Sequence, residues 1–271
     1  MIKVDNVFVG GFVPAFRSIR NSYASWDKSD NEYIINSFTI DVHPAKTLTI
    51  TRYDGVIFGD NDYELAKRLV KAGEPHCKFR RMIVVWMDIT APLYFWKQFD
   101  TYKVGTVANS ESTMHNVTDS EFTNEDFSIT DAVKRSEAFQ STLIFLNNLR
   151  RMYNNTKEKR YFDDIISVLP ESYNQRRSVM LNYSVLASIY KQRKGHKLQE
   201  WKDFCEFIEL FPHAWIFTTN KSGYTEWLED ARRKAKELRE NGKTVKEISE
   251  AIIINWITGE GLNNGGDNKS E

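Results

Sequence analysis

The chain has 271 residues, of which 41% are hydrophobic, so it can bury a sizeable core in one or two domains. Its 37 Lys and Arg residues balance 37 Asp and Glu residues, and net charge therefore gives no argument for nucleic acid or an anionic membrane as partner. No apolar run approaches the roughly 20 residues of a membrane span, and the N-terminus lacks the pattern of a signal peptide, so we expect a cytoplasmic protein.

The N-terminal part of the chain is predicted to consist mainly of strands. Residues 2–9 form a strand candidate that a Gly-Gly pair closes, and residues 15–26 are a candidate short helix. Apolar residues recur at every second position in residues 36–51, on both sides of a His-Pro turn at 43–44, which is typical of half-buried strands. Residues 56–58 add a third short strand.

The central stretch, residues 82–115, combines three different patterns. Four apolar residues at 83–86 predict a buried strand, residues 88–92 supply a break, and the aromatic residues of 91–99 suit a buried helix. Residues 105–113 then offer hydroxyls, an amide and a carboxylate in a predicted loop. Hydrogen-bonding groups at this density beside a buried element indicate a small-molecule site.

Apolar residues at three- and four-residue spacing predict helices in the rest of the chain. The predicted helices cover residues 60–71 with Asp60 as N-cap, 131–153, 161–168, 175–193, 196–210, 227–238 and 244–256. In the helix over 196–210, the expected inner residues are Leu198, Trp201, Phe204, Cys205 and Ile208. We expect a main domain over 1–212, a helical extension over 213–258 and a disordered tail over 259–271.

One predicted helix carries a charged residue on an otherwise apolar face. Within residues 175–193, steps of four, three and four place four side chains on one face: Asn182, Leu186, Ile189 and Arg193. A half-buried Arg needs an anion or a hydrogen-bond acceptor, because leaving it unpaired costs several kcal/mol. The partner of Arg193 is either a ligand or an internal acid such as Glu200 or Asp203.

Cysteine and histidine spacing gives no sign of a metal centre. Cys77 and Cys205 lie far apart and outside any paired motif, so we expect structural thiols in a reducing compartment. None of the five histidines falls at ligand spacing with cysteines or acids, and no zinc site is expected. A Gly-rich phosphate loop and a nucleophile elbow are also absent from the sequence.

Two blocks of the sequence resemble the flavin-dependent thymidylate synthases. The signature of that family is an Ala-Pro helix start, then a Gln followed by Arg-His-Arg, and a Ser seven or eight residues later. The corresponding residues here are Ala91, Pro92, Gln98, Thr101, Tyr102, Lys103 and Ser112, so the frame is kept while Arg-His-Arg is replaced. A second block keeps the family's spacing at Leu169, Pro170, Arg176, Asn182, Arg193 and Gln199.

The resemblance implies roles for two groups of residues. The nucleotide-binding residues that it implies are Gln98, Glu111, Ser112, Arg176 and Arg193, with Arg193 and Ser112 also catalytic. The residues that it implies for FAD are Thr101, Tyr102, Lys103, Asn109, Asn182 and His196. An Arg is a planar donor suited to a phosphate or a uracil carbonyl edge, and it can stabilise charge that builds on the ring. Simpler roles stay open: Gln98 as a core amide, Ser112 as a loop cap and Arg176 as a surface Arg.

The activity that the resemblance implies is that of an FAD-dependent thymidylate synthase. Such a methyltransferase acts on C5 of deoxyuridine monophosphate (dUMP), with methylenetetrahydrofolate as carbon donor and NADPH as electron donor. The resemblance further implies an α+β fold with a central, mostly antiparallel sheet flanked by helices, additional C-terminal helices, and a homotetramer whose subunits share sites. Because only Lys103 keeps a fixed positive charge in the altered motif, two alternatives stay open. These are another pyrimidine-nucleotide-modifying enzyme on the same fold and a catalytically silent nucleotide-binding protein.

Overall fold

The computed structural model describes residues 2–36, 50–218, 233–234, 236–238, 240–243 and 247. The strands in this part are β1 (Lys3–Gly10), β2 (Glu32–Asn36), β3 (Ile50–Ile57), β4 (Val84–Pro92), β5 (Thr106–Ser110) and β6 (Asn174–Asn182). The α-helices are α1 (Phe12–Ser18), α2 (Asp60–Ala72), α3 (Leu93–Phe99), α4 (Thr113–Asn116), α5 (Asp131–Lys134), α6 (Glu137–Thr156), α7 (Lys159–Val168), α8 (Tyr183–Arg193) and α9 (Gln199–Ile208). Short 3-10 helices cover Asn21–Tyr23, Trp26–Lys28, Glu74–His76, Lys78–Arg81, Asn124–Asp126 and Ala214–Ile216.

The described strands form one sheet in the order β2-β3-β1-β4-β6-β5. β1 and β3 are parallel, whereas every other neighbouring pair is antiparallel. Along β4, buried side chains such as Val85, Met87 and Ile89 alternate with the more exposed Trp86 and Asp88. The prediction of an α+β fold around a mostly antiparallel sheet is therefore confirmed.

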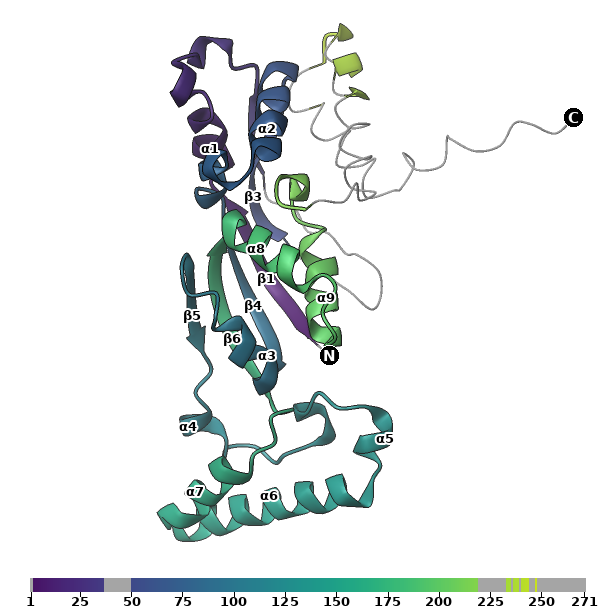
Figure 1. Ribbon diagram of the computed structural model, residues 1–271. Coiled ribbons are helices and arrows are strands. Elements are labelled where there is room, and N and C mark those ends of the chain that lie inside the picture. The colour runs from purple at the N-terminus through teal and green to yellow at the C-terminus, as the bar shows by residue number, and fades with distance from the viewer. Residues whose placement is uncertain are drawn as a thin grey trace, which may run out of the picture.

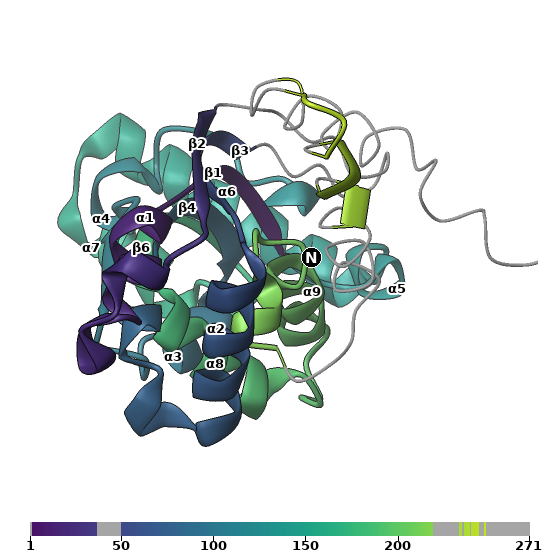
Figure 2. The same ribbon diagram turned by 90° about the horizontal axis from the view of Figure 1, so that it is seen from above.

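Helices cover the buried face of this sheet. Seen from above, α2, α3 and α8 lie on the same side of the strands (Figure 2). The main core brings together Phe16 of α1, Leu65 of α2, Phe95 of α3, Leu186 of α8 and Trp201 of α9, with inward residues of the central strands. The side chains of β4 that point to the other face of the sheet, such as Trp86 at 43% exposure, remain in contact with solvent.

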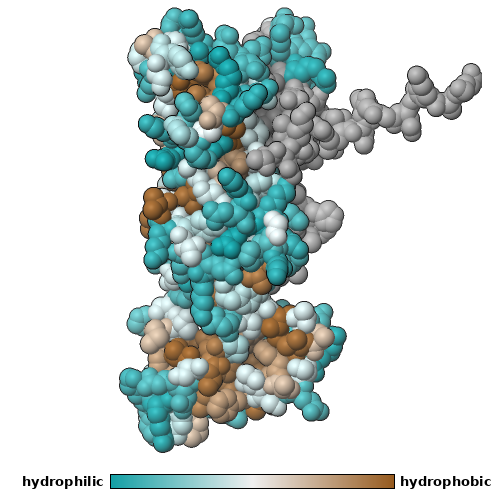
Figure 3. Space-filling view, viewed as in Figure 1, coloured by the Kyte–Doolittle hydropathy of each residue, from teal (hydrophilic) through white to brown (hydrophobic). Residues whose placement is uncertain are grey.

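A second, smaller core lies in a helical lobe at the end of the sheet, formed by residues 113–173 (Figure 1). The long helix α6 packs there against α7 around the buried residues Leu146, Leu149 and Ile165. The outer face of α6 exposes two large apolar side chains, Ile144 at 60% and Phe145 at 50%. Figure 3 shows apolar surface over this lobe. The lobe thus folds around its own core and presents apolar surface outward.

The strand β6 corrects the prediction of one helix over residues 175–193. All nine residues of β6 pair with β4, and five of them also pair with β5. Hydrogen-bonding partners on both sides outweigh the local preference of the sequence, and only the second half of the segment is helical, as α8. Asn182 therefore does not share a helical face with Arg193. It is the N-cap of α8, where its Oδ1 accepts hydrogen bonds from the backbone of Ser184 and Val185 at 3.0 and 3.1 Å.

Two further predictions in the central stretch are corrected by strand pairing. The predicted break at 88–92 is part of the continuous strand β4, because these residues pair with β6 and most of them also with β1. The predicted loop over 105–113 contains β5, which pairs with β6 at the edge of the sheet. The buried strand and the aromatic helix predicted before this loop are confirmed as β4 and α3.

The other helices predicted in the described residues are present, but their first or last residues differ from the prediction. The helix predicted over 131–153 is divided into α5 and α6, because the Ser136 hydroxyl accepts from the Phe139 backbone at 3.3 Å and starts a new helix. The predicted helices over 161–168 and 196–210 correspond to α7 and α9. The predicted helix over 15–26 is shorter and earlier, as α1, followed by two 3-10 helices.

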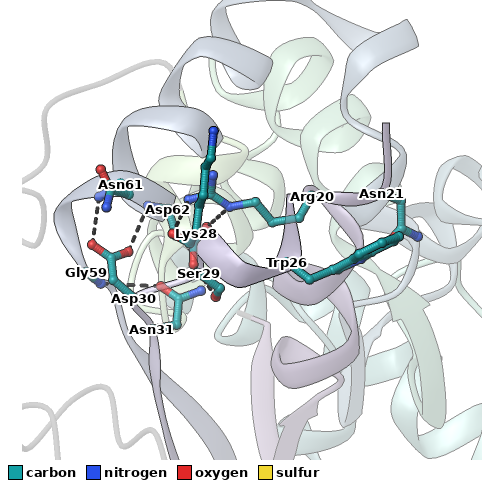
Figure 4. Close-up of polar contacts among 10 residues, drawn as sticks. All are labelled: Arg20, Asn21, Trp26, Lys28, Ser29, Asp30, Asn31, Gly59, Asn61 and Asp62. Carbon is teal, nitrogen blue, oxygen red and sulfur yellow. Dashed lines mark hydrogen bonds and ion pairs between the residues drawn. The ribbon is translucent and has the colours of Figure 1, made fainter. Parts of the chain in front are cut away.

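The start of α2 depends on a distant carboxylate instead of Asp60 (Figure 4). Asp30 accepts hydrogen bonds from the backbone of Asn61 at 2.9 Å and of Asp62 at 3.1 Å, which satisfies two donors of the first turn. Asp62 itself is fully buried and pairs with Arg20. These contacts fasten the segment between α1 and β2 to the N-terminus of α2.

Several predictions lie outside the described residues. They are the turn at 43–44 with most of the strand region around it, most of the C-terminal helices predicted over 227–238 and 244–256, and the tail over 259–271. The described chain remains packed in the main core up to Phe217. In the described ranges, none of the helices combines the length and apolar character needed to cross a membrane.

Candidate functional site

Arg193 and Gln98 form the centre of a polar cluster at the C-terminal ends of α8 and α3. Arg193 Nη1 donates to Gln98 Oε1 at 3.0 Å, and Arg193 Nε donates to the Tyr102 hydroxyl at 2.9 Å. Trp201 Nε1 donates to the same Gln98 oxygen at 2.9 Å. We call Gln98, Tyr102, Arg193 and Trp201 the arginine cluster; it forms because α3, α8 and α9 pack on one face of the sheet.

The partners of Arg193 are neutral. Its Cζ lies 4.7 Å from the ring centroid of Trp201 and 5.7 Å from that of Tyr102, within the range of cation–π attraction. Glu200 and Asp203, the two acids predicted as alternatives, bind the side chains of other residues. Among the described residues, no carboxylate forms an ion pair with Arg193, so no acid offsets the charge of this half-buried guanidinium.

The arginine cluster presents hydrogen-bond donors. Gln98 Oε1 already accepts from both Arg193 and Trp201, which leaves the amide nitrogen as the group of this side chain that the cluster does not use. Arg193 uses Nη1 and Nε within the cluster, and its Nη2 is the remaining nitrogen. A ligand that offers carbonyl, carboxylate or phosphate oxygens matches this arrangement.

His196 borders the arginine cluster. Its ring centroid lies 6.3 Å from that of Trp201, and its Nδ1 accepts a hydrogen bond from the backbone of Leu198 at 3.2 Å. Partial burial, together with the charge of Arg193, lowers the pKa of His196 below its ordinary value. Both effects favour the neutral form of the His196 ring.

A tight turn brings Gly105, two residues after Lys103, next to the N-terminus of α8. Gly105 has a φ of +85°, and a Cβ at this position would lie 2.8 Å from Asn182 Nδ2. Lys103 is exposed and has no ion-pair partner in the described part of the chain. The neighbouring Thr101 hydroxyl donates to the Gln98 carbonyl at 2.7 Å, so it closes the end of α3. Among Thr101, Tyr102 and Lys103, only the side chain of Lys103 forms no hydrogen bond or ion pair with the described residues.

The segment with Ser112 lies between β5 and α4. Ser112 precedes α4 as its N-cap residue, yet its hydroxyl makes no capping hydrogen bond. Glu111 accepts from the Asn116 amide at 2.9 Å and is exposed, and Asn109 is exposed on the edge strand β5. No hydrogen bond joins Ser112 to the arginine cluster within the described ranges. The structure therefore divides the predicted nucleotide site into two halves.

Arg176 lies apart from both halves. It donates to Asp88 at 2.7 Å and to Asp5 at 3.1 Å on the solvent-exposed face of β4 and β6. Partial burial raises the pKa of Asp88, but hydrogen bonds from Ser178, Asn6 and Arg176 outweigh it and hold that pKa below the ordinary value. Two carboxylates thus neutralise Arg176, and the structure does not bring it together with Arg193.

The sequence analysis missed two residues that link the halves, Gln175 and Arg177. On a strand, Arg177 has the same parity as Val179 and Leu181 and faces the helices, whereas Arg176 faces away. A helical assignment hides this alternation. Had residues 174–182 been predicted as a strand, the alternation of its side chains would have placed Arg176 and Arg177 on opposite faces.

The described residues contain no cluster of His, Cys, Asp and Glu side chains that could hold a metal ion. Cys77 and Cys205 are both buried and form no disulfide. Burial raises the pKa of the Cys205 thiol to about 12, so it is not a thiolate at neutral pH. The arginine cluster with its neighbours is the strongest candidate site.

No protein-family model matches this chain, and no curated protein matches it either. Two solved structures of the flavin-dependent thymidylate synthase ThyX from Helicobacter pylori, each with FAD and dUMP, are similar. The first has a TM-score of 0.58 at 17% sequence identity and covers 79% of this chain and 97% of that chain. The second has a TM-score of 0.59 at 16% identity and covers 80% and 97%. The likeness establishes the fold, which this chain shares with the flavin-dependent thymidylate synthases.

Proposed function

We propose that this chain is an FAD-dependent thymidylate synthase-like enzyme that binds dUMP at the arginine cluster and methylates it at C5. Methylenetetrahydrofolate would supply the carbon and NADPH the electrons, which places the enzyme in thymidine nucleotide synthesis. The shared fold supports this proposal, and the observation that carries it is Arg193, a half-buried cation held by neutral partners. An anionic, carbonyl-bearing ligand completes such a site.

The proposed roles follow from the donors that the site presents. Arg193 Nη2 and the Gln98 amide would donate to the oxygens of the pyrimidine or its phosphate, and Arg193 would stabilise negative charge on the ring. Ser112 would bind the nucleotide from the second half of the site, with Glu111 beside it. Trp201 and Tyr102 keep the guanidinium in one orientation, which limits the reorganisation required when the ligand binds.

The residues beside the Gly105 turn fit an anionic cofactor. Lys103 contributes an exposed charge, and Asn182 has its oxygen in the helix cap, which leaves its amide nitrogen as a donor. We propose that these two residues hold FAD, with His196 as a further neutral contact and Asn109 at the edge strand. When bound and reduced by NADPH, the flavin would supply the hydride that reduces the transferred carbon to a methyl group.

The proposal includes a homotetramer in the cytoplasm. Ile144 and Phe145 expose 60% and 50% of their surface on the outer face of α6, and burying them against another copy would remove apolar area from water. Assembly would also bring surfaces of a second chain toward the divided site. The apolar outer face of α6 is thus the surface that we assign to subunit contact.

A specific observation favours a second candidate, a nucleotide-binding protein without redox chemistry. The Tyr102 hydroxyl accepts from Arg193 and donates to Gln192 at 3.0 Å, and the Thr101 hydroxyl is used at the end of α3. The hydroxyls of Tyr102 and Thr101 are thus both used within the chain, which leaves Lys103 as the position of the altered motif that is available to a flavin. A further alternative is an enzyme on this fold that binds the same kind of nucleotide but modifies the pyrimidine in another way.

An absorbance titration of the purified full chain with FAD, with and without dUMP, tests the proposal. A flavin band that stays with the protein after gel filtration and bleaches with NADPH is the expected result. Conversion of dUMP to its C5-methyl product with methylenetetrahydrofolate would distinguish the synthase from another modifying enzyme. Binding of dUMP without retained flavin would overturn the synthase proposal in favour of the second candidate.

A further inference from the structure

Arg177 is the middle of a chain of hydrogen bonds that joins the two halves of the candidate site. Its Nη1 donates to Asp100 Oδ1 at 2.8 Å, and its Nε donates to Gln175 Oε1 at 3.0 Å. The Gln175 amide donates in turn to the Glu111 carbonyl at 2.9 Å and to Thr113 Oγ1 at 3.3 Å. One end of this chain is the residue that follows α3, and the other end flanks Ser112 on both sides.

The middle of the chain is held rigidly. The Arg177 side chain is only 15% exposed, and its Cζ lies 4.4 Å from the ring centroid of Trp96. The indole nitrogen of Trp96 donates to the Gln175 carbonyl at 3.0 Å, and Trp96 itself is 1% exposed. A planar guanidinium stacked in this way has one orientation in which both of its hydrogen bonds form.

The segment with Ser112 depends on this attachment because its local structure is weak. The helix α4 that follows has only four residues, and Ser112 makes no side-chain cap. Strand pairing with β6 ends at Ser110, and one further backbone bond joins Glu111 to Arg176 at 2.8 Å. Beyond that point, the Gln175 amide is the side chain of β6 that holds the segment.

We propose that Gln175 and Arg177 are positioning residues, which set the distance between the Ser112 segment and the arginine cluster so that one nucleotide engages both. The nucleotide named here rests on the proposed function, whereas the attachment itself rests on the contacts alone. Neither residue contacts the ligand in this proposal. Arg177 acts through Asp100 at the end of α3, and Gln175 acts through Glu111 and Thr113.

A second cross-link from α3 provides a matched control. Lys97 forms an ion pair with Glu171, with side-chain exposures of 68% and 54%. It joins the same helix to the segment before β6, but it lies in solvent and does not touch the Ser112 segment. An exposed pair of this kind contributes little to stability or to positioning.

Hydrogen exchange of the full chain without ligand tests the attachment. In Gln175→Met, we expect the backbone amides of Glu111, His115 and Asn116 to exchange at least about fivefold faster than in the wild type. The amides of α8 should keep their protection, which shows that the fold is intact, and Lys97→Met should match the wild type throughout. Unchanged exchange of these three amides in Gln175→Met would overturn the inference.

A double-mutant cycle tests the positioning role in ligand binding. Calorimetric affinity for dUMP is measured for the wild type, Gln175→Met, Ser112→Ala and the double variant. Each single change should weaken binding roughly five- to thirtyfold, and the double variant should bind more tightly than the product of the two losses predicts. Arg177→Lys should show a smaller loss than Arg177→Ala, because Lys keeps the charge opposite Asp100.

The outcomes separate this inference from the proposed function. If the wild type binds dUMP but the effects of Gln175→Met and Ser112→Ala are additive, the positioning role is overturned and the proposed function is not. Failure of the wild type to bind dUMP overturns the proposed function and the ligand named here, while the exchange experiment still decides whether Gln175 holds the segment. If Gln175 only stabilised the fold, Gln175→Met would speed hydrogen exchange throughout the sheet, and its effect on dUMP affinity would add to that of Ser112→Ala.

Discussion

Arg193 donates a hydrogen bond to the side-chain oxygen of Gln98 at 3.0 Å, although 95 positions separate the two residues. The contact joins the ends of two helices that pack on the same face of the sheet. Because Trp201 donates to the same oxygen, the Gln98 amide has one favoured orientation. Binding of an acceptor ligand at this point therefore depends on a geometry that the protein holds before the ligand arrives.

The first prediction concerns Arg193. Arg193→Ala should weaken calorimetric affinity for dUMP roughly ten- to hundredfold, which corresponds to the loss of one hydrogen bond from a charged donor. The far-ultraviolet circular dichroism spectrum should not change. Lys191, exposed in the same last turn of α8, is the control, and Lys191→Ala should bind as the wild type does. Equal affinities of Arg193→Ala and the wild type would contradict the assignment of the site.

The second prediction separates cofactor from nucleotide. Lys103→Ala should weaken FAD binding more than dUMP binding, because Lys103 is the one fixed charge that the altered motif retains. Paired fluorescence and calorimetric titrations measure the two affinities on the same preparations. Lys71→Ala, an exposed cation at the end of α2, should change neither. The opposite order of effects would count against the proposed division of the site.

The third prediction concerns pH and the buried His213. Burial lowers the pKa of His213 from its ordinary value of 6.5 to about 3, against a backbone hydrogen bond with Val56 that raises it. Between these two values, only the unfolded chain carries a proton on this ring. The free energy of unfolding therefore decreases as the pH falls through this window, by up to about 1.4 kcal/mol per pH unit from His213.

The variant His213→Asn tests that contribution. Asn tolerates the positive φ of 53° at this position and does not titrate. Urea unfolding of the variant between pH 6.5 and pH 4, within the window set by the two pKa values, should show a shallower dependence on pH than the wild type. Parallel curves for the two proteins would show that another group controls acid stability.

The fourth prediction concerns the turn beside Asn182. Gly105→Ala should lower the free energy of unfolding by about 1–2 kcal/mol, because an L-residue at positive φ is strained and the new Cβ would meet the Asn182 amide. Gly195→Ala is the matched control, since no atom lies within 4 Å of a Cβ there. Thermal unfolding measures both. If both variants lost a similar free energy of unfolding, the positive φ and the contact with Asn182 would not explain the effect at Gly105.

The fifth prediction concerns subunit contact. Phe145→Glu on the outer face of α6 should reduce the molar mass in sedimentation velocity from that of a tetramer to that of a smaller species, because burying a carboxylate in an apolar interface is costly. Asn155→Glu, near the end of the same helix, should leave the mass unchanged. A wild-type chain that sediments as a monomer would contradict the proposed assembly.

Local spacing in the sequence determined much of the core. Apolar residues at helical spacing located Trp201, Phe204 and Ile208, and all three are buried in α9. The same kind of spacing located Leu186 and Ile189 on the inner side of α8. Such predictions hold because burial of one face imposes its period on the residues of a single element, whatever packs against it.

The positions of the polar groups followed from contacts between distant segments. Residues 174–182 form a strand because β4 and β5 pair with them on both sides, and no local pattern reveals those partners. That pairing decides that Arg177 faces the helices while Arg176 faces two carboxylates. It also turns Asn182 from a member of a helical face into a helix cap. The sequence by itself thus determined the fold class, through the resemblance, and much of the apolar core. Only the tertiary structure decided that Arg193 meets Gln98 and which polar groups share their side of the sheet, because helix packing, strand pairing and parity depend on residues far away in the chain.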